Sequence, residues 1–161
     1  MKFDFVSVKS PQDLVLNELD SALSYRSFIC VRSKTKDIIY TYTHKAHKKT
    51  LLKLTQDKEN NLHLWIRFSA AESYSAYFTE KLIETLEEDK YRYVGCYPNC
   101  CECDVKKGYI ITSPKGSFFR CYKELIHIGK LDELPLEEVL TLIDIQNAFE
   151  KQSVEKTLRK L

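Results

Sequence analysis

Apolar and polar residues alternate along residues 61–69, which carry the clearest pattern in the chain. One side of this segment is formed by Leu62, Leu64, Ile66 and Phe68. The other side is formed by His63, Trp65 and Arg67. Because successive side chains of a strand point to opposite faces, the alternation predicts a strand in a sheet with one strongly apolar face.

Residues 27–32, 37–43 and 50–55 are further predicted strands, separated by short polar segments. We expect these three strands and residues 61–69 to form a four-stranded antiparallel meander. Residues 3–8 roughly alternate as well and predict one more short strand.

Helical spacing of apolar residues predicts a helix over residues 11–24 and another over residues 135–150. The first follows Ser10, a good N-cap, and begins with Pro11, a residue favoured in the first helical turn. Residues 151–161 are rich in charge and are predicted to be a frayed end or a short extension of the last helix.

A third helix is predicted over residues 73–89. It carries Phe78, Leu82 and Leu86 at four-residue intervals, which places them on one stripe. We expect this stripe to cover the apolar face of the sheet, because the opposite face would bury His63 and Arg67.

The second half of the chain adds a hairpin: residues 108–113 and 117–122 flank the turn sequence Pro114-Lys115-Gly116. The whole pattern predicts one α+β domain over residues 1–150. Its mainly antiparallel sheet is packed by helices on one face, and a Cys-rich hairpin region, residues 95–125, and a C-terminal helix complete it.

The composition is that of an ordinary globular protein, with 43% hydrophobic residues and a net charge of +2 over 161 residues. So mild a charge does not by itself indicate a nucleic-acid partner. Asp4 interrupts the only apolar run near the start, and no stretch approaches the roughly 20 apolar residues of a membrane span. We therefore expect a cytoplasmic protein with no membrane contact; the sequence does not identify its partner, for which a protein and a nucleic acid are the candidates.

Five of the six cysteines lie between residues 96 and 121, and thiolates gathered in this way suit zinc. The predicted ligands of a structural zinc ion are Cys96, Cys100, Cys103 and Cys121. Because adjacent cysteines seldom bind the same ion, one of Cys100 and Cys101 is a spare thiol, and His127 is a reserve ligand. Free thiols packed in the core, or a disulfide or redox switch, are the alternatives. The sixth cysteine, Cys30, lies mid-strand and is predicted to be a core residue.

Residues 32–53 are rich in lysine, with aromatic residues interleaved. A basic, aromatic sheet surface can bind single-stranded nucleic acid by phosphate contacts and base stacking. The candidate residues are Lys45, Lys48, Lys49, Tyr40 and Tyr42. The alternative is that the lysines mark only the solvated face and the edge strands of the sheet.

No catalytic residue is nominated, because none of the familiar nucleophile, metalloprotease or phosphate-loop motifs occurs in the chain. We expect a non-enzymatic binding or regulatory domain with a structural zinc site. A nucleic-acid-binding protein that uses the basic 32–53 surface, and a thiol-based redox sensor or enzyme, are the alternatives.

The first 90 residues resemble the small bacterial α+β domains of the YjbR/YdhG-like kind. The strand sequences Asp-Ile-Ile-Tyr-Thr-Tyr, Thr-Leu-Leu-Lys-Leu-Thr and Leu-His-Leu-Trp-Ile-Arg-Phe carry the resemblance. Some of those domains continue with a Cys-rich segment, a hairpin and a helix, and residues 95–149 are similar to that arrangement. The resemblance implies a fold only, since the group has no agreed catalytic set.

Overall fold

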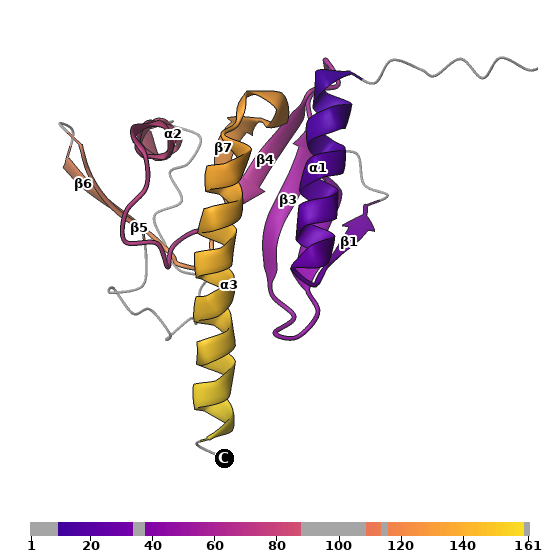
Figure 1. The fold of residues 1–161 in the computed structure, drawn as a ribbon. Helices are drawn as coiled ribbons and strands as arrows, with labels where there is room; N and C mark the ends of the chain where they lie inside the picture. Colours follow the sequence, from indigo (N-terminus) through magenta and orange to yellow (C-terminus); the bar gives the residue numbers. More distant parts are fainter. Residues whose placement is uncertain (1–9, 34–37, 88–108, 114–115, 160–161) are drawn as a thin grey trace, which may run out of the picture.

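The structure is a computed structural model that describes residues 10–33, 38–87, 109–113 and 116–159 (Figure 1). The strands are β1 (Phe28–Arg32), β2 (Ile38–His44), β3 (Thr50–Gln56), β4 (Leu62–Ile66), β5 (Tyr109–Ser113), β6 (Gly116–Arg120) and β7 (Ile126–Lys130). The helices are α1 (Pro11–Tyr25), α2 (Ala76–Glu87), the short 3-10 helix η3 (Leu131–Glu133) and α3 (Leu136–Leu158). The protein is an α+β fold.

Five strands form an antiparallel sheet in the order β1-β2-β3-β4-β7, so the predicted four-stranded meander is confirmed. Between β3 and β4 the register places the buried apolar residues beside one another, and the side chains between them meet on the other face. Leu54 pairs with Leu64, and one residue earlier on β3 Lys53 pairs with Trp65. This matched alternation fixes the register, since a one-residue slip would turn every side chain to the other face.

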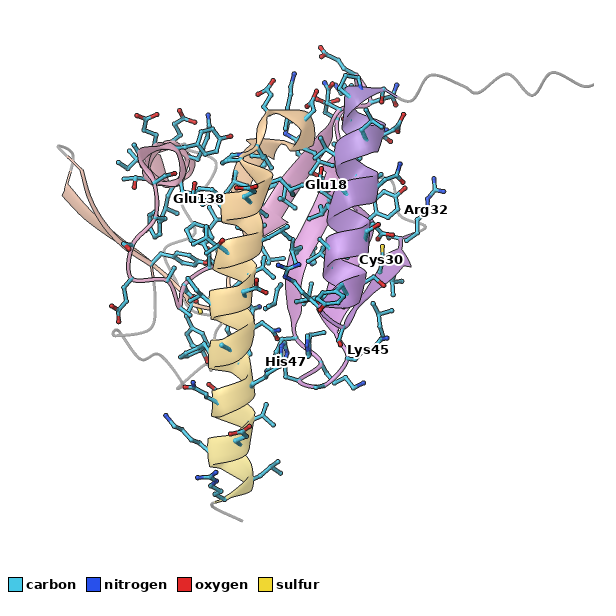
Figure 2. The ribbon with its side chains drawn as sticks, in the orientation of Figure 1. Glu18, Cys30, Arg32, Lys45, His47 and Glu138 are labelled. Atoms are coloured by element: carbon cyan, nitrogen blue, oxygen red, sulfur yellow. The ribbon has the colours of Figure 1, made fainter. Side chains whose placement is uncertain are left out.

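Among the strands that the structure describes, β1 is an edge of the sheet and pairs with β2 alone. Cys30 is therefore exposed, and the prediction that it is a core residue was wrong (Figure 2). Ile29 and Val31, on the other face of the same strand, are 44% and 58% exposed. The sequence pattern could not reveal this, because an edge strand and a central strand share the same composition.

The fifth strand of the sheet, β7, was not predicted. It is only five residues long, and its alternation is confined to Ile126 and Ile128, which are buried, with His127 between them. It pairs antiparallel with β4 and places His127 opposite Trp65. The face of the sheet opposite the core therefore carries His127 as well as His63, although the two residues are far apart in the sequence.

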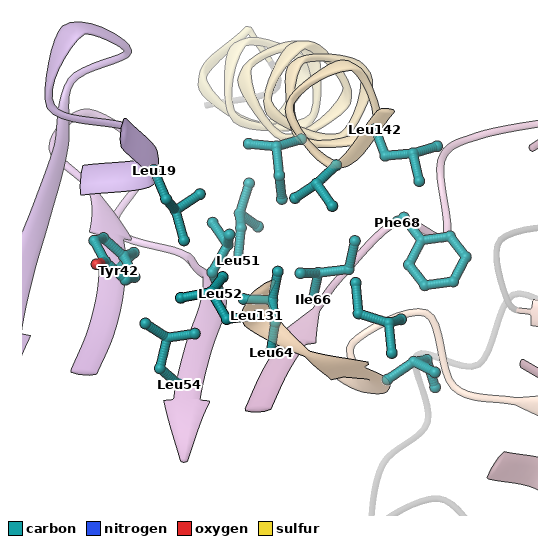
Figure 3. Close-up of a cluster of buried hydrophobic side chains, with 14 of the residues drawn as sticks. Leu19, Tyr42, Leu51, Leu52, Leu54, Leu64, Ile66, Phe68, Leu131 and Leu142 are labelled. Atoms are coloured by element: carbon teal, nitrogen blue, oxygen red, sulfur yellow. The ribbon is translucent and has the colours of Figure 1, made fainter. Parts of the chain in front are cut away.

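The core lies on one face of the sheet, beneath α1 and α3, which run side by side over it (Figure 1). Its fully buried strand residues include Leu52, Leu54, Leu64, Ile66 and Ile128 (Figure 3). Leu51 is buried as well as Leu52, because a bulge between the Tyr42–Leu52 and Thr43–Thr50 pairs leaves Leu51 without a partner.

Helix α1 begins at a capping box, in which Ser10 and Asp13 exchange hydrogen bonds with each other's backbone N–H groups. It buries Leu19 and Leu23 against the sheet. At its C-terminal end Arg26 donates to both carboxylate oxygens of Asp144 on α3, at 2.8 and 3.0 Å. The two helices are therefore joined by a bidentate ion pair as well as by the core.

Helix α2 packs against β7, and its Phe78 and Leu82 are fully buried, as is Phe68. It begins at Ala76, three residues later than predicted. The preceding Ser75 donates its backbone N–H and its hydroxyl to the Glu138 carboxylate of α3, at 2.8 and 2.7 Å. A carboxylate is favourable at this positive helix end, and it ties α2 to α3.

The hairpin of β5 and β6 is present as predicted, with Ile111 paired to Phe118. Tyr109 anchors it: the buried hydroxyl donates to the carbonyl of Glu124 at 3.1 Å and accepts from the backbone N–H of Phe68 at 3.0 Å. The predicted strand at residues 3–8 and the cysteine segment before Tyr109 lie outside the described residues.

Helix α3 extends to Leu158, so residues 151–158 continue the predicted C-terminal helix, and it runs past the end of the sheet (Figure 1). Its buried stripe begins with the expected Val139 and Ile143 and then continues with polar residues. No helix in the part of the chain that the structure describes is long and apolar enough to span a membrane.

The assignment of the apolar face can be tested by three aromatic substitutions. Phe78→Ala should lower the unfolding free energy by about 3–5 kcal/mol, the usual cost of deleting a buried aromatic side chain. Trp65→Ala, on the half-buried opposite face, should cost clearly less. Tyr25 is 90% exposed, and Tyr25→Ala should stay within about 0.5 kcal/mol of wild type. Urea unfolding measures all three, and equal losses for Phe78 and Tyr25 would contradict the assignment.

Candidate functional site

The predicted zinc ligands lie mostly outside the described residues. Cys96, Cys100 and Cys103 are among those not described, together with Cys101. Cys121 is described: it directly follows β6 and is a half-buried free thiol. In the described ranges, no group of three or more histidine, cysteine or acidic residues could hold a metal ion.

The predicted nucleic-acid residues separate into two environments. Lys45, Lys48 and Lys49 are exposed in the loop between β2 and β3. Tyr42 is 1% exposed and Tyr40 packs against the core, because both lie on the helix-covered side of β2. Tyr42 therefore does not offer a ring face to a base, and Tyr40 is half-buried.

The lysine-bearing loop is held in one shape by two histidines from inside. His44 Nδ1 accepts from the backbone N–H of Ala46 at 3.1 Å, and His47 Nδ1 accepts from that of Lys49 at 3.2 Å. Their imidazole rings stack at 4.2 Å between centroids. Lys48 has a φ of 57°, which the tight reversal at this point requires.

Asn147 of α3 holds the same loop from outside. Because His47 Nδ1 is an acceptor, its Nε2 carries the hydrogen and donates it to Asn147 Oδ1 at 2.8 Å. Both side chains are buried, and they lie 100 residues apart in the chain. This bond fixes the loop relative to α3.

Two further buried polar residues of α3 continue this contact. Gln146 Oε1 accepts from the backbone N–H of Ala70 at 2.9 Å, and its amide donates to Glu150 at 3.1 Å. Glu150 also pairs with Arg67 at 3.6 Å. We call Gln146, Asn147 and Glu150 with these partners the polar seam. Sequence reasoning missed it, although its members continue the Val139–Ile143 helical spacing.

The seam brings a fourth lysine beside the loop. Lys151 follows Glu150 on α3, and its charge acts on both His44 and His47. Tyr25 lies nearby: the carbonyl of Ser27, two residues on, accepts from the Lys45 backbone N–H at 2.9 Å. We call Tyr25, Lys45, Lys48, Lys49 and Lys151 the basic end. Figure 2 shows His47 beside α3 and Lys45 farther from α3, near the lower end of α1.

The basic end is not neutralised by its surroundings. Among the described residues, none of its four lysines forms an ion pair. Glu150, the acid in the adjoining seam, is buried and already paired with Arg67. The positive potential of the lysines is therefore available to an anionic partner.

A second polar cluster lies on the half-buried face of the sheet, opposite the core. Asp57 Oδ2 and His63 Nε2 are 3.0 Å apart, and His63 Nδ1 and His127 Nε2 are also 3.0 Å apart. The Trp65 ring lies 4.9 Å from that of His127. Hydrogen bonds from Asn61 and His63 hold the pKa of the Asp57 carboxyl well below its usual range, so it is a carboxylate at neutral pH.

Cys30 borders a small cavity of about 90 Å³, lined by Asp20, Ser24, Phe28, Cys30 and Tyr42. Burial raises the pKa of the Cys30 thiol. A raised pKa lowers the fraction of reactive thiolate. Among the cysteines that the structure describes, Cys30 is therefore a poor candidate for the redox alternative.

Comparison with known proteins finds no matching family model, no matching curated protein and no matching solved structure. The function must therefore be argued from the geometry of the two clusters.

The buried histidine pair makes stability depend on pH. Burial lowers the pKa of His44 and His47 below the usual 6.5, against the opposing effects of Asn147 and Glu150 on His47. Lys151 lowers both values, and Lys49 lowers that of His47. Below about pH 6.5 the unfolded chain binds protons that the folded chain does not, so the unfolding free energy should fall as the pH falls.

Urea unfolding at pH 7.5 and pH 5.5 measures this loss. His47→Gln should reduce the difference between the two pH values. An unfolding free energy that is the same at both, or a difference that His47→Gln leaves intact, would contradict the interpretation.

Proposed function

We propose that this protein is a non-enzymatic binding domain that binds single-stranded nucleic acid at the basic end. The observation that carries the proposal is the convergence of three loop lysines with Lys151, around the His47–Asn147 hydrogen bond. Phosphate groups are the ligands that such a cluster attracts, and lysine contacts give binding that tracks the backbone rather than the sequence.

Tyr25 favours a single strand over a duplex. Its ring is 90% exposed at the end of α1, beside the loop that carries Lys45. An exposed aromatic ring can stack on a base that is unpaired, whereas the bases of a duplex are already stacked on one another. The proposal therefore assigns phosphate contacts to the lysines and base stacking to Tyr25, in place of Tyr40 and Tyr42.

The local clustering of lysines at the basic end supports the proposal, whereas the net charge of the whole chain does not. The net charge of the chain is only +2. The basic end nevertheless carries four lysines on a loop and a helix that the polar seam holds together. Fixed lysines lose less freedom on binding than lysines on a mobile tail, so each phosphate contact retains more of its favourable energy.

The binding site can be tested with a fluorescently labelled single-stranded oligonucleotide and anisotropy at several salt concentrations. Four phosphate contacts predict that the logarithm of the binding constant falls with the logarithm of salt with a slope of about 3. The triple variant Lys45→Glu, Lys48→Glu, Lys49→Glu should lose binding. Lys58→Glu, an exposed lysine in the turn after β3, is the matched control and should bind like wild type.

Tyr25→Ala should weaken single-strand binding by about 1–3 kcal/mol, the usual worth of one stacked base. No binding at low salt, or binding that the triple variant retains, would refute the proposed site. Equal affinity for a duplex of the same length would refute the role of Tyr25.

We also propose a structural zinc ion at Cys96, Cys100, Cys103 and Cys121. The support is the sequence: Cys100 and Cys103 have the two-residue gap of a chelating pair, and Cys121 follows them on the far side of a hairpin. The ion would cross-link the two sides of the hairpin and would take no part in nucleic-acid binding.

Elemental analysis of the purified protein should find close to one zinc per chain. Cys103→Ser should lose the metal and lower the melting temperature, because the free energy of metal binding is part of the folding free energy. Cys30→Ser is the control and should keep both. A metal-free wild-type protein of unchanged stability with six titratable thiols would rule the site out.

A further inference from the structure

We propose that two copies of this protein form a symmetric dimer by pairing their β1 strands, with Arg32 of each copy seated beside the partner's Asp20. The two strands run antiparallel across a two-fold axis at Cys30, so that one sheet continues into the other. This surface goes beyond the proposed nucleic-acid site, because it uses the edge of the sheet and none of the residues of the basic end.

The backbone of β1 leaves a row of hydrogen-bonding groups on its free side. The carbonyl of Ser27 accepts from the Lys45 backbone N–H at 2.9 Å, just before the pairing of Phe28 with β2 begins. In an antiparallel ladder this bond makes Phe28 a residue whose own N–H and C=O point away from β2, and the alternation repeats the pattern at Cys30 and Arg32. Among the described strands only β2 pairs with β1, so these groups face outward.

Strand β1 also lacks the features by which edge strands usually avoid association. Its pairing with β2 is regular along the whole strand, whereas the β2–β3 ladder contains irregularities. It has no proline, and its only charged residue is Arg32 at the end. Ile29 and Val31 are apolar and exposed on the face opposite the core. Since a protected edge carries lysines, proline or a bulge, this strand is suited to pairing with another.

A two-fold axis at Cys30 matches the strand to its own copy. Cys30 then lies opposite the partner's Cys30, and the two residues exchange backbone hydrogen bonds. Ile29 lies opposite the partner's Val31, so the exposed apolar side chains cover one another. Phe28 lies opposite the partner's Arg32, and both side chains are on the helix-covered face, because they alternate with Ile29 and Val31 along the strand.

The same register brings the partner's Arg32 to the small cavity between α1 and the edge strand. The residues that line this cavity of about 90 Å³ are Asp20 and Ser24 of α1 and Phe28, Cys30 and Tyr42 of the sheet. Figure 2 shows Cys30 and Arg32 at the side of α1 that faces away from α3. Because Phe28 lines the cavity and the partner's Arg32 lies opposite Phe28, the guanidinium comes within reach of the Asp20 carboxylate.

The charges of this edge complement one another across the two-fold axis, which identifies a second copy as the occupant. Asp20 and Arg32 are both exposed, and among the described residues neither forms an ion pair in its own chain. The dimer pairs them twice. A guanidinium has more N–H donors than one carboxylate needs. The buried Tyr42 hydroxyl borders the same cavity, has no hydrogen-bond partner among the described residues and can accept another.

Sedimentation equilibrium of the purified protein, with any metal it carries, should show a monomer–dimer equilibrium. Arg32→Asp and Asp20→Arg should each raise the dimer dissociation constant by about 100-fold or more, because each places like charges together at both symmetric positions. The double variant that carries both changes exchanges the two charges and should restore the dimer.

Val31→Lys should weaken the dimer as well, since it puts a charge in the middle of the paired strands. Leu158→Lys is the matched control: Leu158 is 65% exposed at the end of α3, away from β1, and its replacement should change nothing. Circular dichroism checks that each variant is folded. A wild-type protein that is monomeric at every concentration, a dimer that survives the single charge reversals, or a folded double variant that stays monomeric overturns the proposal. None of these outcomes bears on nucleic-acid binding, which uses the basic end.

Discussion

The position of α3 depends on polar groups that are buried and must find partners. Gln146, Asn147 and Glu150 lie on the helix face turned to the sheet. An unpaired buried polar group costs about 1–3 kcal/mol, so these side chains stabilise only the alignment in which their partners are in reach. Apolar contacts at Val139 and Ile143 would tolerate a shift along the helix axis, whereas the seam does not. It therefore specifies one docking of α3 and one shape of the β2–β3 loop.

The chemistry of the protein follows from which side of the sheet is covered. The helices bury one face, and the polar alternate residues are left on the other, where Asp57, His63 and His127 form their chain of contacts. The polar seam lies where α3 runs past the end of the sheet. The lysines of the basic end lie beside it. The basic end and the Asp57–His63–His127 cluster are thus products of one amphipathic sheet: the first includes its β2–β3 loop, and the second lies on the face opposite the core.

The amphipathic elements could be predicted from the sequence, and the candidate sites largely could not. The alternation around Leu64 and Ile66 identified the buried face, and the Phe78–Leu82 spacing identified the buried side of α2, which packs against β7 while α1 and α3 lie over the rest of the face. The assignment of Tyr42 to a binding surface failed because strand alternation does not say which of two partly apolar faces is covered. His63 and His127 are 64 residues apart. Only the unpredicted pairing of β7 with β4 brings them together.

The central claim is that the seam positions the basic end, and Asn147→Leu tests it most directly. Leucine has a similar shape but no acceptor, so His47 Nε2–H is left buried without a partner. The account predicts an unfolding free energy lower by about 1–3 kcal/mol and weaker binding of a single-stranded oligonucleotide, although every lysine is retained. If this variant binds the oligonucleotide with wild-type affinity, the claim that the seam positions the lysines is contradicted.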